Sequence, residues 1–348
     1  MGEEVGSVML GFVEISHESS ALAEAEAVSA AEALGGGAVA EGIRVPGLVA
    51  VQVPDRSVFT ALAARLALAR RCLVPVPTDR DARSASRREG ARGGSASFRR
   101  LGRPSSGGTD REVLANGRAF KEGGGVIDLE SPSRRFWLAA GDEGQEHLLE
   151  EVASTDRASI AQRRMPLLPF RRPVSLPPRL ARAAVNLARV APEDRVLDPF
   201  LGTGALLAEA GLLGGRLYGI DRDATMVRGA LRNFSHLGVA AEELVVGDAR
   251  EADFVDPSTR FAAIVTDTPY GRSSSTGGEA VFELISQVLA RWTDRLAPEG
   301  RVAVVVPEGP GSAKLPGTPR FRVPVRVHRS LTREFCLYER SSLTRSWC

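Results

Sequence analysis

Five consecutive residues, Asp267-Thr268-Pro269-Tyr270-Gly271, place an acid, a rigid turn and an aromatic ring side by side. They follow the apolar run 261–265, which predicts a buried strand, so they stand at a strand end. The Asp267 carboxylate and the Thr268 carbonyl are both hydrogen-bond acceptors, and together they can hold the two N–H groups of an exocyclic amine. The chemistry that these residues suit is group transfer to an amine nitrogen.

The neighbouring residues would suit an amine that belongs to a nucleobase. The exocyclic nitrogen of guanine or adenine is a poor nucleophile because its lone pair is delocalised into the ring, so a site must turn the lone pair toward a methyl donor. Pro269 restricts Thr268 to an extended conformation, which helps to aim its carbonyl, and Tyr270 can stack on an extruded base. Catalysis would then be mostly positioning, without a covalent intermediate.

Enzymes that methylate an exocyclic base amine usually carry Asp or Asn, two prolines and an aromatic residue at this place, and this chain resembles them at all but one position. Thr268 replaces the first proline. It keeps the carbonyl, loses rigidity and adds an N–H, so we expect a Thr268→Pro variant to keep or raise activity. Taken alone, the motif could also be a strand-ending turn with a capping aspartate.

Three more acids are expected at successive strand ends upstream. Asp198 opens the run 198–204, which contains two glycines that would let a ligand approach the backbone. Asp221 follows the next expected strand at about the spacing at which an acid meets ribose hydroxyls in nucleotide-binding sheets. Asp248 follows the third strand, where its carboxylate could accept an adenine amino group. Four acids at four strand ends predict one shared site.

The pattern from residue 180 onward predicts a doubly wound parallel sheet. Strands are expected at 195–197, 216–220, 243–246, 261–266 and 301–306, and helices at 180–190, 204–213, 223–237 and 279–296. This alternation is typical of α/β proteins, in which ligands bind at the carboxyl ends of the strands.

The order of these motifs resembles a class I S-adenosylmethionine-dependent methyltransferase with a Rossmann-like sheet. The resemblance implies S-adenosylmethionine as cofactor, with the region of Asp198 at its methionine part, Asp221 at its ribose and Asp248 at its adenine. The chain also lacks a phosphate-binding lysine in this region, and the cofactor carries no phosphate. The candidate cofactor-binding residues are Asp198, Phe200, Gly202, Thr203, Gly204, Asp221, Asp248 and Ala249.

Charge is unevenly distributed along the chain although the net charge is only +2. Residues 1–43 hold eight glutamates and no Lys or Arg, whereas residues 157–189 hold eight arginines and no acid. Residues 80–120 carry ten arginines against four acids. The planar guanidinium suits phosphate recognition, and clustered arginines indicate a nucleic-acid partner. An arginine-rich composition on solvated faces is the alternative explanation for any single cluster.

The first half of the chain predicts small α+β domains. Strands are expected at 9–16, 47–53 and 72–76, with helices at 21–34 and 57–71. Residues 79–109, rich in Arg, Ser and Gly, predict a long loop or hairpin, and strand-like segments return at 96–100, 125–129 and 135–139. Five prolines between 166 and 178 predict an extended, stiff linker.

Most of the chain resembles the THUMP-domain tRNA guanine-N2-methyltransferases, which modify guanosine 10 of tRNA. Residues 172–188 and 327–333 are similar to that family's entry helix and last strands, 97–100 and 126–132 to its THUMP core, and 22–26 to its ferredoxin-like domain. The resemblance implies a ferredoxin-like domain at 1–76, a THUMP domain at 77–154, a basic linker at 155–179 and a methyltransferase domain at 180–348. It also implies that the first half grips tRNA.

Other functions stay open at this point. The amine could belong to another RNA or DNA base, since the Asp-x-Pro-Tyr cluster does not separate N2 of guanine from N6 of adenine. A THUMP RNA-binding protein without catalysis is a second alternative. The spacing of Cys72, Cys336 and Cys348 argues against a zinc site, and no apolar run suggests a membrane span. We expect a cytoplasmic enzyme, with a protein partner left open.

Overall fold

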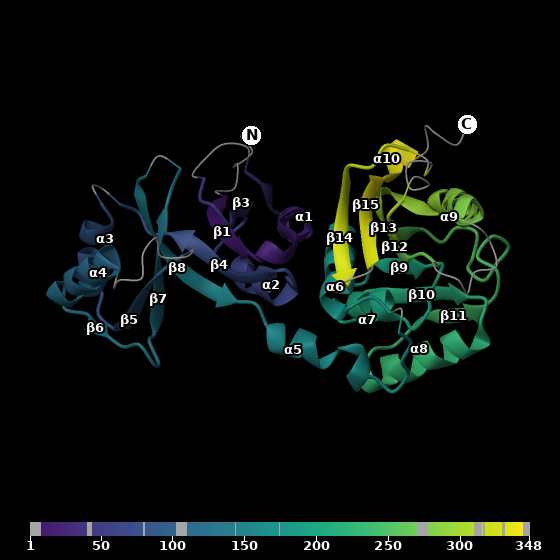
Figure 1. Ribbon diagram of the computed structural model, residues 1–348, viewed down its shortest axis with the longest axis horizontal. Helices are drawn as coiled ribbons and strands as arrows, with labels where there is room; N and C mark the ends of the chain where they lie inside the picture. Colours follow the sequence, from purple (N-terminus) through teal and green to yellow (C-terminus); the bar gives the residue numbers. More distant parts are fainter. Residues whose placement is uncertain are drawn as a thin grey trace, which may run out of the picture. The chain divides into compact units, whose positions relative to one another are not determined.

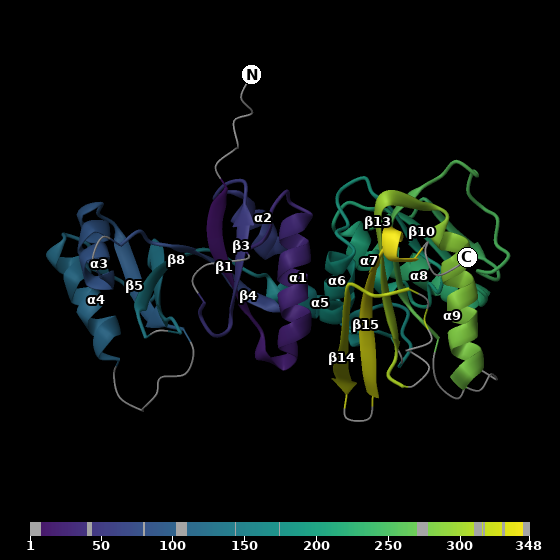
Figure 2. The same cartoon turned by 90° about the horizontal axis from the view of Figure 1, so that it is seen from above.

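The structure is a computed structural model that describes residues 8–39, 44–78, 81–101, 110–142, 144–173, 175–269, 278–309, 315, 317–328 and 331–343. The chain divides into two compact units (Figures 1 and 2). Unit 1 comprises residues 1–20, 34–64 and 69–155, and unit 2 comprises residues 21–33, 65–68 and 156–348. Within the described residues, no helix combines the length and apolar character needed to cross a membrane.

Unit 1 is built on an eight-stranded sheet with the order β2-β3-β1-β4-β8-β7-β5-β6. The strands are β1 Met9–Ile15, β2 Gly37–Ala38, β3 Leu48–Val53, β4 Ala69–Pro75, β5 Ser95–Arg100, β6 Val126–Ile127, β7 Arg134–Ala140 and β8 Glu146–Ser154. Helix α2, Val58–Arg65, ends well before residue 71, because Ala69 already begins β4; the predicted helix at 57–71 was too long. The division into ferredoxin-like and THUMP domains stays a prediction.

Much of the predicted loop at 79–109 is regular structure, so that prediction was wrong. Helix α3, Ala82–Ala91, is capped by Asp81, whose side chain accepts a hydrogen bond from the Ser84 N–H. It packs against α4, Arg111–Glu122, so closely that a Cβ on Gly90 would lie 2.0 Å from the Phe120 carbonyl oxygen. The glycine that suggested a loop therefore permits helix contact, while most of the arginines of α3 face solvent.

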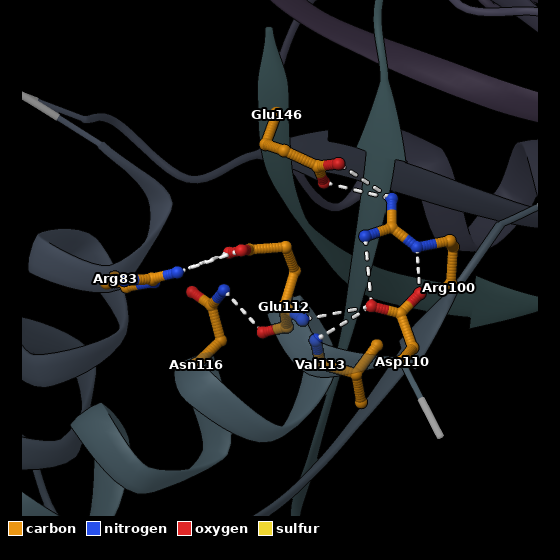
Figure 3. Close-up of polar contacts among 7 residues, drawn as sticks. All are labelled: Arg83, Arg100, Asp110, Glu112, Val113, Asn116 and Glu146. Atoms are coloured by element: carbon orange, nitrogen blue, oxygen red, sulfur yellow. Dashed lines mark hydrogen bonds and ion pairs between the residues drawn. The ribbon is translucent and has the colours of Figure 1, made fainter. Parts of the chain in front are cut away.

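An arginine–carboxylate cluster joins α4 to the sheet of unit 1 (Figure 3). Arg100 on β5 binds both oxygens of Asp110 and donates to Glu146 on β8 at 2.8 and 3.0 Å. Asp110 also caps α4, since its Oδ1 accepts from the N–H groups of Glu112 and Val113. The hydrogen bonds from Arg100 are the largest cause of the lowered pKa of Asp110.

Unit 2 contains a seven-stranded sheet with the order β11-β10-β9-β12-β13-β15-β14. The strands are β9 Arg195–Asp198, β10 Arg216–Asp221, β11 Glu243–Val246, β12 Phe261–Asp267, β13 Leu296–Pro307, β14 Phe321–His328 and β15 Leu331–Glu339. The first five in spatial order are parallel, and β15 pairs antiparallel with both neighbours. The strand order reverses between β9 and β12, so the predicted Rossmann-like α/β sheet is confirmed.

Helices cover both faces of this sheet. The helices assigned mainly to unit 2 are α1 Ser20–Glu32, α5 Arg157–Gln162, α6 Pro178–Leu187, α7 Ala205–Gly211, α8 Ala224–Leu237, α9 Gly278–Thr293 and α10 Arg340–Leu343. Apolar side chains of α9, including Ile285 and Trp292, share a core with Ile264 of β12. On the other face, α7 approaches β10 so closely that a Cβ on Gly219 would lie 3.1 Å from Leu207. Both faces of the central strands are buried, which explains their continuous apolar runs.

Candidate active site

A cavity of about 710 Å³ opens where β9, β10, β11 and β12 end. All four predicted acids, Asp198, Asp221, Asp248 and Asp267, line it. Parallel strands bring their carboxyl ends to one edge of the sheet, and the change of strand order between β9 and β12 leaves room there for a ligand. The predicted meeting of the four acids at one site is therefore observed in the structure.

Asp198 ends β9 and is 1% exposed. Its Oδ1 accepts hydrogen bonds from the Thr266 hydroxyl at 2.7 Å and the Phe200 N–H at 3.0 Å. Burial raises the pKa of Asp198 to about 7, and the nearby charges of Asp267 and Asp221 act in the same direction. The buried Asp198 side chain thus fixes the start of the turn after β9 through its hydrogen bond with the Phe200 N–H.

The turn after β9 is tied to Asp221 at the end of β10. Gly202 has a φ of +53° and donates its N–H to Asp221 Oδ2 at 2.8 Å. Gly202 and Thr203 line the cavity, whereas Gly204 is absent from its lining. Gly204 has a φ of +79°, and a Cβ there would meet the Phe234 ring at 2.7 Å. Gly204 is therefore required for its left-handed backbone and for close packing against α8, and it does not line the cavity in this structure.

Asp248 and Ala249 line the cavity after β11. Arg250 donates to the Asp248 carboxylate through Nε at 3.0 Å and Nη2 at 2.6 Å, and these bonds are the main cause of its lowered pKa, about 2. The Ala249 carbonyl accepts from the Trp292 indole at 2.9 Å. Asp248 is therefore ionised at neutral pH, and a ligand amine bound to it would share the carboxylate with Arg250.

Asp267 ends β12, and 17% of its side chain is exposed. Its Oδ2 accepts a hydrogen bond from Arg333 Nη1 at 2.6 Å. Its Oδ1 is buried and accepts no hydrogen bond from the described part of the chain. Burial raises the pKa of Asp267 to about 7, and the Arg333 guanidinium opposes that rise. Oδ1 thus has no donor among the described residues, and because this atom is shielded from solvent, a ligand N–H would reach it only after its surroundings rearrange.

Thr268 is fully buried and is fixed by its neighbour strand. Its N–H donates to the Val305 carbonyl at 2.9 Å and its hydroxyl donates to the same oxygen at 3.1 Å. The rigidity expected to be lost with the missing proline is supplied by these two bonds. A proline at 268 would remove both, so the structure argues against the expectation that Thr268→Pro keeps activity. Pro269 lines the cavity, whereas Tyr270 and Gly271 lie outside the described residues.

Comparison with known proteins decides the family. The model of the RMKL-like methyltransferase domain family matches residues 167–315. A tRNA (guanine(10)-N2)-dimethyltransferase of Methanothermobacter thermautotrophicus is 37% identical over 228 residues, which cover 64% of this chain and 67% of that protein. The chain belongs to the tRNA (guanine(10)-N2)-dimethyltransferase family. The family predicted from the motifs is thereby confirmed.

Two further relatives agree with this assignment. The Pyrococcus abyssi protein of the same name is 42% identical over 175 residues, covering 49% of this chain and 52% of its own length. A probable member from Methanothermococcus thermolithotrophicus is 36% identical over 126 residues, covering 32% of this chain and 74% of its own length. The matched segments thus span from about half to three quarters of these relatives.

The cavity has further lining residues that sequence patterns did not indicate. Helix α9 contributes Glu283, Leu284 and Gln287, and the segment before α6 contributes Arg172 and Ser175. Glu283 and Gln287 stand one helical turn apart and are joined by a 3.4 Å hydrogen bond, a spacing that could have drawn attention to that helix face. The segment is tied to the turn after β9 by a hydrogen bond between Ser175 and Thr203 hydroxyls at 2.9 Å.

The residues of this cavity fit S-adenosylmethionine, the cofactor implied by family membership. Its volume lies within the roughly 300–1,000 Å³ of small-molecule sites. Gly202 holds a left-handed backbone where the chain turns into the cavity, and Asp221 stands beside it, with one oxygen bound to Gly202 and the other to the Asp223 N–H. The acids offer acceptors for hydroxyl and amino groups, as a nucleoside with an amino-acid arm requires.

Proposed function

We propose that this protein transfers a methyl group from S-adenosylmethionine to the exocyclic N2 of a guanosine in tRNA, with position 10 as the target. The observation that carries the proposal is the state of Asp267. Its carboxylate ends β12 at the cavity, one oxygen is paired with Arg333, and the other is left without a donor among the described residues. An amine N–H is the group that such an oxygen lacks.

The protein's own residues would act by orientation. The cofactor supplies the electrophilic methyl group. Asp267 Oδ1 and the Thr268 carbonyl would accept the two N–H groups of the guanine amine, which turns its lone pair toward the methyl carbon. Nitrogen would gain a positive charge as it takes the methyl carbon from sulfur, which keeps the electron pair of the broken C–S bond, and would then lose a proton. Because its pKa is about 7, ionised Asp267 can accept that proton near neutral pH.

The remaining cavity residues would hold the cofactor. Asp198 and the turn at Phe200, Gly202 and Thr203 would surround its methionine part, with Gly204 supporting that turn by packing. Asp221 would accept hydrogen bonds from the ribose hydroxyls. Asp248 and Ala249 would border the adenine. Tyr270 keeps its proposed role in stacking on the base.

The arginines of residues 157–189 include two different groups. Arg163 of the linker and Arg182 of α6 both bind Glu209, at 2.7 Å from each Nε, and Glu209 is 2% exposed, so these two arginines are structural. Arg157, Arg164 and Arg171 are exposed. We assign contacts with tRNA phosphates to these exposed arginines. We also assign tRNA binding to the proposed ferredoxin-like domain at 1–76 and THUMP domain at 77–154.

Mass spectrometry of nucleosides tests the function directly. The protein is incubated with unmodified tRNA and isotope-labelled S-adenosylmethionine, and labelled N2-methylated guanosine is expected at position 10. Labelled N6-methyladenosine would favour another base amine. Cofactor binding by calorimetry without any label in tRNA would favour a non-catalytic RNA-binding protein. An Asp267→Asn variant serves as the control because it should bind cofactor and transfer little or no methyl.

A further inference from the structure

Arg333 reaches the site from a strand that is not adjacent to β12. It lies on β15, which pairs with β13, which in turn pairs with β12. Its side chain is 1% exposed, and Nη1 lies 2.6 Å from Asp267 Oδ2. The residue lies in the segment 327–333, which resembles the family's last strands, but outside the motifs at the four strand ends, and it is absent from the lining of the cavity. Arg333 therefore touches the carboxylate from behind.

We propose that Arg333 is a positioning residue for Asp267: it occupies Oδ2, keeps the carboxylate ionised and leaves Oδ1 as the oxygen that accepts the target amine. This inference rests on the proposed function of the same site. The short charged hydrogen bond fixes the orientation of the carboxylate. A carboxyl that carried a proton would present a donor where the N–H groups of the amine need an acceptor, and a carboxylate that rotated would point Oδ1 away from them.

The charges around Asp267 explain why a cation is needed. Burial is the largest influence and raises the pKa of Asp267, while Arg333 lowers it. Asp198 on β9 is a second nearby acid, whose pKa the charge of Asp267 raises, and Glu283 of α9 lines the same cavity. Without Arg333 the pKa of Asp267 would rise further, and the protonated form would dominate at neutral pH.

Stability gives little reason for a buried ion pair at this place. Removing an arginine from water costs several kcal/mol, and apolar replacements of buried pairs are often neutral or stabilising. Burial also lowers the pKa of Arg333, with Asp267 opposing the change. An arginine buried at this cost is better explained by its effect on Asp267 than by its contribution to folding.

The test uses the pH dependence of kcat in three variants of the full chain. Arg333→Met removes the charge and keeps an unbranched side chain, Arg333→Lys keeps a charge, and Arg322→Met removes an arginine from the neighbouring strand β14. In Arg333→Met we expect the acid limb of kcat to move upward by about one pH unit or more, with about a fivefold or greater loss at pH 7 that is largely recovered at high pH. Arg333→Lys should move the limb less, and Arg322→Met should leave it in place.

A purely structural role would lower kcat by the same factor at every pH, and that result would overturn the inference. Titration of the Asp267 carboxyl by carbon-13 NMR gives a second measurement that needs no tRNA. We expect a higher pKa in Arg333→Met than in the wild type, and equal values would also overturn the inference. If the first neutral variant does not fold, Arg333→Gln replaces it. The wild-type protein could methylate no tRNA guanosine while the pKa of Asp267 still rises in Arg333→Met. That result would refute the proposed function and leave the effect of Arg333 on Asp267 supported.

Discussion

Two aspartates in this molecule are each paired with an arginine, yet their pKa values shift in opposite directions. Asp110 of unit 1 and Asp267 of unit 2 have similar side-chain exposure, 20% and 17%. Asp110 receives hydrogen bonds from Arg100 and from two backbone N–H groups, and its pKa is lowered (Figure 3). Among the described residues Asp267 receives one hydrogen bond, from Arg333, and burial raises its pKa to about 7.

The difference teaches that burial and the supply of hydrogen-bond donors together separate this structural acid from the proposed functional one. At Asp110 each oxygen is satisfied, so the carboxylate fixes the start of α4 and has nothing left to offer a ligand. At Asp267 the surrounding protein removes water, and a single arginine compensates only partly. The remaining capacity of Oδ1 is the property that a substrate amine can use.

The largest expected effect is on kcat and comes from removing the charge of Asp267, with the same change at Asp110 as the comparison. Asp267→Asn should lower kcat for tRNA methylation by about 10²–10³, because the amide can donate where the site needs an acceptor. Cofactor affinity should stay within a few-fold. Asp110→Asn should leave kcat unchanged. Single-turnover kinetics and calorimetry measure both quantities, and an equal loss of kcat in the two variants would break the comparison.

The second effect concerns the residue beside Asp267. Thr268→Pro removes two hydrogen bonds to the Val305 carbonyl, which is then left buried with less compensation. We expect kcat to fall by about tenfold or more and unit 2 to lose about 1–3 kcal/mol of stability. Thr268→Ser keeps both donors and should behave as the wild type, whereas Thr268→Val removes only the hydroxyl and should be intermediate. Undiminished turnover in Thr268→Pro would show that Pro269 alone aims the carbonyl.

The four acids could be predicted from sequence because one local rule places them. Each ends an apolar run, and parallel strands that alternate with helices share one functional edge. Asp198, Asp221, Asp248 and Asp267 needed no knowledge of distant contacts. The hydrogen-bond partners of these acids could not be predicted in the same way. Arg250 binds Asp248 and Thr266 binds Asp198 only because of the folded geometry.

The contact between Arg333 and Asp267 could not be predicted from the sequence. Arg333 comes 66 residues after Asp267, and its strand is separated from β12 by β13. Helix α3 was missed for another reason. Its Arg and Ser residues match a loop composition, and the close packing that makes Gly90 useful depends on α4, about 30 residues later. Composition reports local preference, whereas these features arise from tertiary contact.

A third, smaller effect is expected on tRNA binding. It compares exposed arginines of the linker with Arg163, which is paired with an acid. Changing Arg157, Arg164 and Arg171 together to Gln should weaken tRNA binding by about tenfold near physiological salt and reduce the salt slope by about 2. Arg163→Gln instead breaks the contact with Glu209 and should act mainly on the stability of unit 2. Affinity titrations at several salt concentrations test this, and an unchanged slope would place the RNA-binding surface elsewhere.

The smallest expected effect is on stability, and its sign reverses between the two units. The folded-state pKa of Asp110 is lowered, so its contribution is present above the unfolded pKa of about 4 and is lost as pH falls through the folded value. Asp110→Asn keeps an oxygen for the α4 cap and should destabilise unit 1 by about 0.5–1 kcal/mol at pH 7 and less at pH 3.

Asp198 has the opposite shift, and the same substitution should therefore act in the opposite direction. Its folded-state pKa is raised to about 7, so folded unit 2 binds more protons than the unfolded chain between about pH 4 and 7, and its stability falls as pH rises across that window. Asp198→Asn should leave stability near pH 4 unchanged and raise it above pH 7. Urea unfolding with pulsed hydrogen exchange reports the two units separately. Loss of stability in both variants at pH 8 would show that the hydrogen bonds of Asp198 outweigh the cost of burying its charge.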